Sequence, residues 1–93
     1  MSNNENTKNT RYISAGAYDS QIFKDEVNRA NLRVIYQALC EKGYNPIAQL
    51  SGYVLSSDPT YITTHNNARI MITRIDRDDI LRILMEDFFK DKD

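Results

Sequence analysis

The sequence predicts an all-α protein, a small bundle of about four helices that follows a disordered N-terminal tail. Three observations lead to this prediction. Apolar residues recur at helical spacing in four separate segments, and turn-forming residues stand between these segments. No segment alternates apolar and polar residues over the length of a strand. The first stretch of the chain is polar, which is typical of a segment that does not fold by itself.

The tail is expected to span residues 1–20, and the helical domain residues 21–93. The first ten residues include four asparagines and no apolar run, so they cannot bury enough surface to offset the entropy of ordering. They do not resemble a signal peptide. No stretch approaches the roughly 20 apolar residues of a membrane span. We therefore expect a cytoplasmic protein without a membrane partner.

A first helix is predicted from about Asp25 by one apolar stripe at positions i, i+3, i+4 and i+7. The stripe consists of Leu32, Ile35, Tyr36 and Leu39. The helix should end at Lys42 and Gly43, since a cation suits a helix C-terminus and glycine can adopt positive φ.

Asn45 and Pro46 predict the start of a second helix, with the asparagine as its cap and the proline in its first turn. Ile47, Leu50 and Val54 give its apolar face. Gly52 weakens this helix and indicates a close approach of another backbone.

Two further apolar stripes follow a break at residues 56–60. Thr63 or Thr64 should cap the third helix, and Asp76 the fourth, with Asp78 and Asp79 favourable in its first turn. A single long helix bent near Asp76 is the alternative. The third stripe contains Ala68, Met71, Ile72 and Ile75. The fourth, which is expected to be the core face of its helix, contains Ile80, Leu81, Leu84 and Phe88.

The ordered part would hold about 70 residues, a size at which a single core is marginal. The four helices have wide apolar faces, and their combined apolar surface is larger than a core of this size can bury. Self-association into a homodimer is therefore predicted, and a compact monomeric bundle is the alternative.

The composition argues against several kinds of chemistry. A structural zinc site needs about four Cys or His ligands, and the chain has one of each, Cys40 and His65. A Cys-His pair is conceivable, but Cys40 adjoins the apolar stripe of the first helix, which predicts a buried, inert thiol. His65 is expected at the surface, at the start of the third helix. No glycine-rich phosphate loop is present. We therefore expect no metal, no cofactor and no enzymatic activity.

The charge argues against nucleic acid as the main partner, because the net charge is −1 and the pI about 5.8. The arginines of the later helices could line a helix-turn-helix, but the connection from Ser56 to Thr64 is too long for the usual turn. Solvated helix faces with local ion pairs explain the same residues.

Three strings carry a family resemblance: EKGYNP at 41–46, GYVLSSDPTYI at 52–62 and HNNAR at 65–69. In this order and spacing the chain resembles the IreB-type regulatory phosphoproteins of Gram-positive bacteria, over roughly residues 28–89. The resemblance implies a small α-helical homodimer without known catalytic activity. It also implies a link to a membrane Ser/Thr kinase with extracellular wall-sensing repeats.

The family's phosphorylated threonines lie in the N-terminal tail, and Thr7 and Thr10 match them in their spacing of three. Lys8 and Asn9 stand between them where acidic residues are expected. Ser57 replaces the usual glycine before Asp-Pro. The resemblance names no downstream protein for this chain.

The tyrosine-rich strings have two interpretations. They can be structural, as a helix junction and a turn with packed tyrosines. Alternatively they form a partner surface, because tyrosine offers a large apolar face and a polar tip. The residues of that surface would be Tyr44, Tyr53, Asp58, Tyr61 and Asn67.

Overall fold

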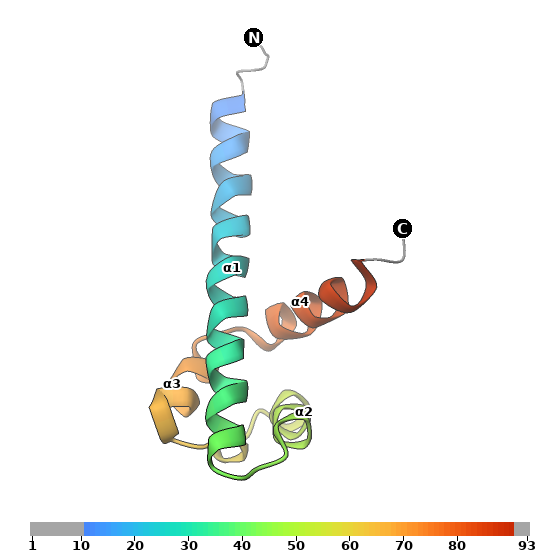
Figure 1. Cartoon of the computed structure of the whole chain (residues 1–93). Helices are drawn as coiled ribbons and strands as arrows, with labels where there is room; N and C mark the ends of the chain where they lie inside the picture. The colour runs from blue at the N-terminus through green and yellow to red at the C-terminus, as the bar shows by residue number, and fades with distance from the viewer. Residues whose placement is uncertain (1–10, 91–93) are drawn as a thin grey trace.

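The computed structural model describes residues 11–90, with side chains from residue 20 onward, and all regular secondary structure in this part of the chain is helical. Figure 1 shows a long first helix with the other elements gathered around its C-terminal half. The α-helices are α1 (Arg11–Glu41), α2 (Pro46–Ser56), α3 (Ala68–Thr73) and α4 (Arg77–Phe89). Two short 3-10 turns, η1 (Pro59–Tyr61) and η2 (His65–Asn67), connect α2 to α3. The predicted all-α fold with four helices is confirmed.

Helix α1 begins earlier than the apolar pattern predicted. It starts at Arg11, whereas the pattern indicated a start near Asp25. Residues 11–20, expected in the tail, are therefore helical in the structure. No proline interrupts the sequence from Arg11 to Glu41, and Ala15 and Ala17 favour a helix, so a helix formed further along can extend through this segment.

The junction between α1 and α2 follows the predicted capping pattern. Gly43 has a φ of 82°, the left-handed conformation that ends many helices. The N–H of Tyr44 then donates to the Leu39 carbonyl at 3.0 Å. The Asn45 side chain accepts a hydrogen bond from the Ala48 N–H at 3.1 Å, and Pro46 is the first residue of α2.

Gly52 lies under the ring of Tyr61, so the close approach predicted at this glycine comes from a side chain and not from a backbone. A Cβ atom at residue 52 would overlap the Tyr61 ring. The Gln49 side chain donates to the Tyr61 carbonyl at 2.9 Å. Together these contacts fix η1 against α2.

Helices α3 and α4 are separate, which excludes one continuous bent helix. Asp76 has a ψ of 137° and stands at the N-cap of α4, as predicted, but its side chain makes no capping hydrogen bond. Its carbonyl instead accepts from the Ile80 N–H at 3.0 Å. Before α3, Asn66 and Asn67 both have positive φ, so Asn67 takes the N-cap position that was predicted for a threonine.

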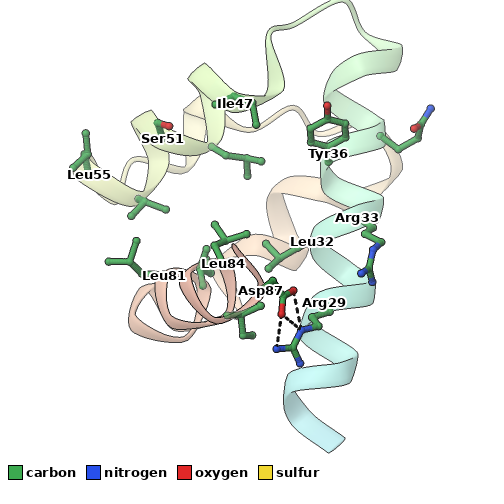
Figure 2. Close-up of a pocket in the computed structure, with 15 residues that line it drawn as sticks. Arg29, Leu32, Arg33, Tyr36, Ile47, Ser51, Leu55, Leu81, Leu84 and Asp87 are labelled. Carbon is green, nitrogen blue, oxygen red and sulfur yellow. Dashed lines mark hydrogen bonds and ion pairs between the residues drawn. The ribbon is translucent and has the colours of Figure 1, made fainter. Parts of the chain in front are cut away.

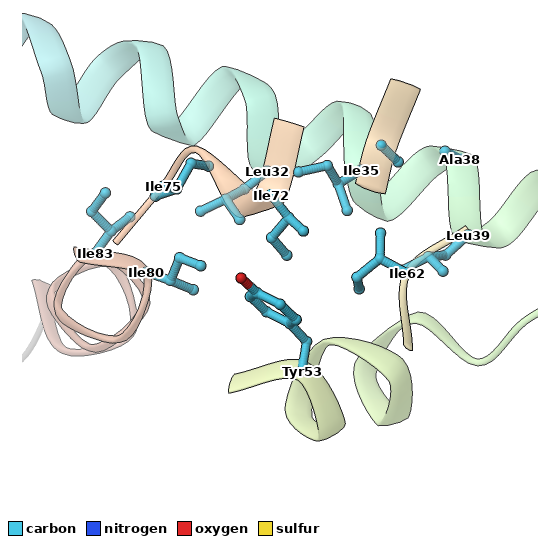
Figure 3. Close-up of a cluster of buried hydrophobic side chains, with 11 residues drawn as sticks. Leu32, Ile35, Ala38, Leu39, Tyr53, Ile62, Ile72, Ile75, Ile80 and Ile83 are labelled. Carbon is cyan, nitrogen blue, oxygen red and sulfur yellow. The ribbon is translucent and has the colours of Figure 1, made fainter. Parts of the chain in front are cut away.

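The hydrophobic core lies between the C-terminal half of α1 and the elements packed around it (Figure 3). Tyr53 extends from α2 into the middle of this cluster. Helix α4 contributes only Ile80 and Ile83. Leu81, Leu84 and Phe88, predicted to be core residues, are exposed. The core therefore consists of Leu32, Ile35, Ala38, Leu39, Tyr53, Ile62, Ala68, Ile72, Ile75, Ile80 and Ile83.

Candidate protein-binding groove

An open groove of about 840 Å³ lies between α1, α2 and α4 (Figure 2). Nine of its fifteen lining residues are leucine, isoleucine or valine, so its surface is mainly aliphatic. In Figure 2, Leu81 and Leu84 stand on α4 and face α2, while Ile47 and Leu55 line the opposite side. The aliphatic residues are Leu32, Ile47, Leu50, Val54, Leu55, Ile80, Leu81, Ile83 and Leu84.

The groove exists because α2 and α4 each bury only a small part of their apolar surface. Tyr53 is the buried residue of α2, and Ile80 and Ile83 are those of α4. The remaining apolar side chains reach solvent: Leu55 is 85% exposed, and Ile47 is 63% exposed. Phe88, one turn beyond Leu84, is 73% exposed. A continuous apolar surface of this kind is characteristic of protein contact sites.

An ion pair between α1 and α4 forms one end of the groove. The Nε atom of Arg29 lies 3.1 Å from both carboxylate oxygens of Asp87, and its Nη2 atom lies 3.0 Å from Oδ1. The hydrogen bonds from Arg29 hold the pKa of Asp87 below its usual value. The pair therefore stays charged and fixes the C-terminal half of α4 beside α1.

A second ion pair joins the same two helices. Asp25, at 8% exposure, is the one charged residue that is buried among the side chains the structure describes. Arg82 donates to it through both terminal nitrogens, each at 2.9 Å. Arg82 also reaches Asp79 and Glu86 on its own helix. The hydrogen bond from Arg82 lowers the pKa of Asp25, outweighing the opposite effect of burial.

Of the five residues predicted to form a partner surface, Tyr53 lies within α2 and the other four lie between α-helices, and none of the five lines the groove. Tyr53 is a core residue, and Tyr61 packs on Gly52. Asp58 caps η1 by accepting from the Thr60 N–H at 3.0 Å and the Thr60 hydroxyl at 2.7 Å. Tyr44 is about half exposed, and the backbone of Asn67 precedes α3. A role for these residues in partner binding stays a prediction.

The residues of the groove were missed because the apolar stripes of α2 and α4 were read as core faces. The available signal was the excess of apolar residues over what a core of this size can cover. That excess predicted an exposed apolar surface, but not its position.

Cys40, His65 and the two N-terminal threonines are the remaining candidate residues. Cys40 is exposed, so the predicted buried thiol is wrong: Ala38 and Leu39 occupy the buried positions, and the next residue points away from them. His65 is partly exposed, and its Nε2 atom lies 2.8 Å from Oε1 of Glu41. Thr7 and Thr10 lie outside the described residues.

Metal binding and membrane insertion are two further functions to consider. The described residues contain no cluster of three or more His, Cys, Asp or Glu side chains arranged to hold a metal ion. Among the helices between residues 11 and 90, none combines the length and apolar character needed to cross a membrane.

A small all-helical domain with an open aliphatic groove is typical of domains that bind protein helices. The model of the IreB regulatory phosphoprotein family matches residues 14–90 of this chain. A UPF0297 protein from Lachnoclostridium phytofermentans is 46% identical over 77 residues, which cover 83% of this chain and 82% of the relative. The chain belongs to the IreB regulatory phosphoprotein family, and a regulatory role follows from this membership.

Proposed function

We propose that this chain is a non-enzymatic regulatory phosphoprotein that acts through protein–protein binding. Family membership supports the regulatory role, and the groove supports the binding of protein. The groove is the main observation in favour of protein binding, because its exposed aliphatic surface suits a helix better than it suits a polar substrate. A small helical nucleic-acid-binding or adaptor module is the alternative. The net charge of −1 favours the adaptor over the nucleic-acid reading.

The regulatory input would be phosphorylation of Thr7 and Thr10 by a Ser/Thr kinase of cell-envelope stress signalling, acting on the cytoplasmic side. Residues 1–24 carry three basic and two acidic side chains, a net charge of +1. Each phosphate adds about −1.5 to −2 near neutral pH, so two phosphates reverse the sign of this segment. The modified tail would then leave acidic surfaces and gain affinity for arginine-rich ones.

The groove would be filled by a second copy of the chain. On α4, Leu84 lines the groove and Phe88 stands one turn beyond it, so both lie next to the groove that they would fill on the other copy. A two-fold contact requires this arrangement, because each copy must offer both the ridge and the groove. Leu84 and Phe88 are the expected ridge residues, and Ile47 and Leu55 would cover them.

Light scattering of the purified chain tests the homodimer. The unmodified protein should have about twice the 10.8 kDa chain mass. Leu84→Glu should give a monomer, because a charge would be buried in the interface. The matched control is Ile70→Glu: Ile70 is a similarly exposed aliphatic residue on α3, outside the groove, and its replacement should leave the dimer intact. A monomeric wild type, or a dimeric Leu84→Glu protein, contradicts this assignment.

The downstream protein can be identified by its response to the phosphates. Kinase-treated and untreated protein would be used in parallel pull-downs, with the recovered proteins identified by mass spectrometry. At least one recovered protein should prefer one of the two forms. Equal recovery of every partner from both forms would contradict the regulatory switch.

A further inference from the structure

Helix α1 carries a second exposed apolar surface, away from the groove. It consists of Phe23, Val27, Ala30 and Val34, which we call the α1 stripe. Phe23 is 69% exposed, and the other three residues are also exposed. At 3.6 residues per turn, the stripe lies roughly 120° around the helix from the side that lines the groove. A second copy seated in the groove would therefore leave the stripe uncovered.

The spacing of the stripe is that of a helix–helix seam. Successive residues are separated by four, three and four positions, the pattern of two helices that pack along a common line. This part of α1 leads into the N-terminal half, which projects beyond the other helices in Figure 1. The stripe is thus accessible to another long helix.

We propose that the α1 stripe pairs antiparallel with the α1 stripe of another copy of this chain. The four-three-four spacing is the same in both directions. Two antiparallel copies therefore place Val27 opposite Ala30 of the other copy, and Phe23 opposite Val34. Each contact occurs twice around a two-fold axis, and in each a larger side chain meets a smaller one, which favours close packing.

The charges beside the stripe favour the antiparallel direction. Glu26 and Arg33 are seven residues apart and flank the stripe on the same side. In the antiparallel pair, Glu26 of each copy lies near Arg33 of the other, which gives two complementary pairs. A parallel pair brings Glu26 near Asn31 instead. Exposed ion pairs contribute little energy, so these charges favour one direction of pairing but add little to its strength.

The size of the stripe indicates a weak contact. A stable interface buries about 800 Å² on each partner, and four side chains on one helix cover less. The stripe would act mainly between dimers that already exist, because a dimer formed through the groove carries two stripes and can bind through both. The expected product is an assembly of dimers. The assembly of dimers rests on the homodimer proposed above, whereas the pairing of two α1 stripes does not depend on that homodimer.

Sedimentation velocity of the full chain over a wide concentration range tests this proposal. The wild-type mass should rise above that of a dimer as the concentration increases. Val27→Glu should remain a dimer at every concentration, while the control Ile70→Glu should assemble as the wild type does. A wild-type mass that never exceeds the dimer, or an unchanged Val27→Glu profile, overturns the proposal. The Leu84→Glu protein separates the two ideas. It should be monomeric at the concentrations of the light-scattering test, because the groove contact is lost, and it should pair through the stripe only at much higher concentration.

Cysteine cross-linking tests the direction of pairing. In a Cys40→Ser background, a Val27→Cys chain mixed with an Ala30→Cys chain should form a disulfide-linked pair. Either chain alone should form far less. Efficient cross-linking of each chain with itself indicates parallel pairing and overturns the antiparallel assignment. Charge reversal gives an independent check: Glu26→Arg and Arg33→Glu should each weaken the assembly, and the double variant should restore it.

Discussion

The guanidinium of Arg82 on α4 holds the carboxylate of Asp25 on α1 through two parallel hydrogen bonds of 2.9 Å. The two residues are 57 positions apart in the sequence. This bidentate contact is one of two ion pairs that link α1 to α4, two of the three helices around the groove. It helps to set where α4 lies, and so how wide the groove is.

The Asp25–Arg82 contact should make the stability of the fold depend on pH in the acid range. The pKa of Asp25 is lowered from 3.8 in the folded protein. Such a carboxylate adds stability above its unfolded pKa, and this stability is lost as the pH falls through the folded pKa. Urea unfolding at pH values from 7 to below 4 should therefore show a decline that is smaller in Asp25→Asn. An equally steep decline in that variant would assign the effect to other carboxylates, of which Asp87, Glu41 and Asp58 also have lowered pKa values.

Gly52→Ala should destabilise the protein, although alanine is the better helix former. In an open position the replacement stabilises a helix by about 0.5–1 kcal/mol. Here the new Cβ overlaps the Tyr61 ring, and forced overlap costs about 1–3 kcal/mol. Thermal unfolding should give a lower midpoint for Gly52→Ala than for the wild type. Gly52→Ala combined with Tyr61→Ala should lose less stability than the sum of the two single variants, and strict additivity would contradict a direct clash.

Ile83 and Leu84 are neighbours on α4 and should respond differently to the same replacement. Ile83 is fully buried, so Ile83→Ala should lower the free energy of unfolding by about 2–5 kcal/mol. Leu84 is about half exposed in the groove, so Leu84→Ala should have a much smaller effect on the folding of a single chain. Its main effect should appear in self-association, measured by light scattering under dilution. Equal losses of stability in both variants would mean that Leu84 belongs to the core.

Replacement of Thr7 and Thr10 by alanine should abolish phosphorylation without changing the fold. Kinase treatment followed by mass spectrometry of the intact chain should add up to two phosphates to the wild type and none to the double variant. Both unmodified proteins should unfold at the same temperature, because the hydrophobic core of the described residues includes neither threonine, and substitutions outside a core usually have effects below about 0.5 kcal/mol. Phosphorylation of other residues only would contradict the assignment of Thr7 and Thr10 as the regulatory site.

The sequence by itself determined where most of the helices lie and how they end. Leu32, Ile35 and Leu39 follow a single helical stripe, and local spacing suffices to predict it. Gly43 and Asn45 mark the junction of α1 and α2 through short-range preferences of φ and capping. The three motif strings likewise predicted the family that the comparison with known proteins confirmed.

Only the tertiary structure decided which apolar residues are core and which form the groove. Ile80, Leu81 and Leu84 all fit a helical stripe, because the apolar face of α4 is wider than the face that α1 can cover. Their separation depends on the rotation of α4 about its axis, which the distant pairs Asp25–Arg82 and Arg29–Asp87 help to set. The ring of Tyr61 over Gly52 depends in the same way on how the chain returns after η1. Local periodicity shows that a surface is apolar, but the packing of distant segments decides whether that surface is buried.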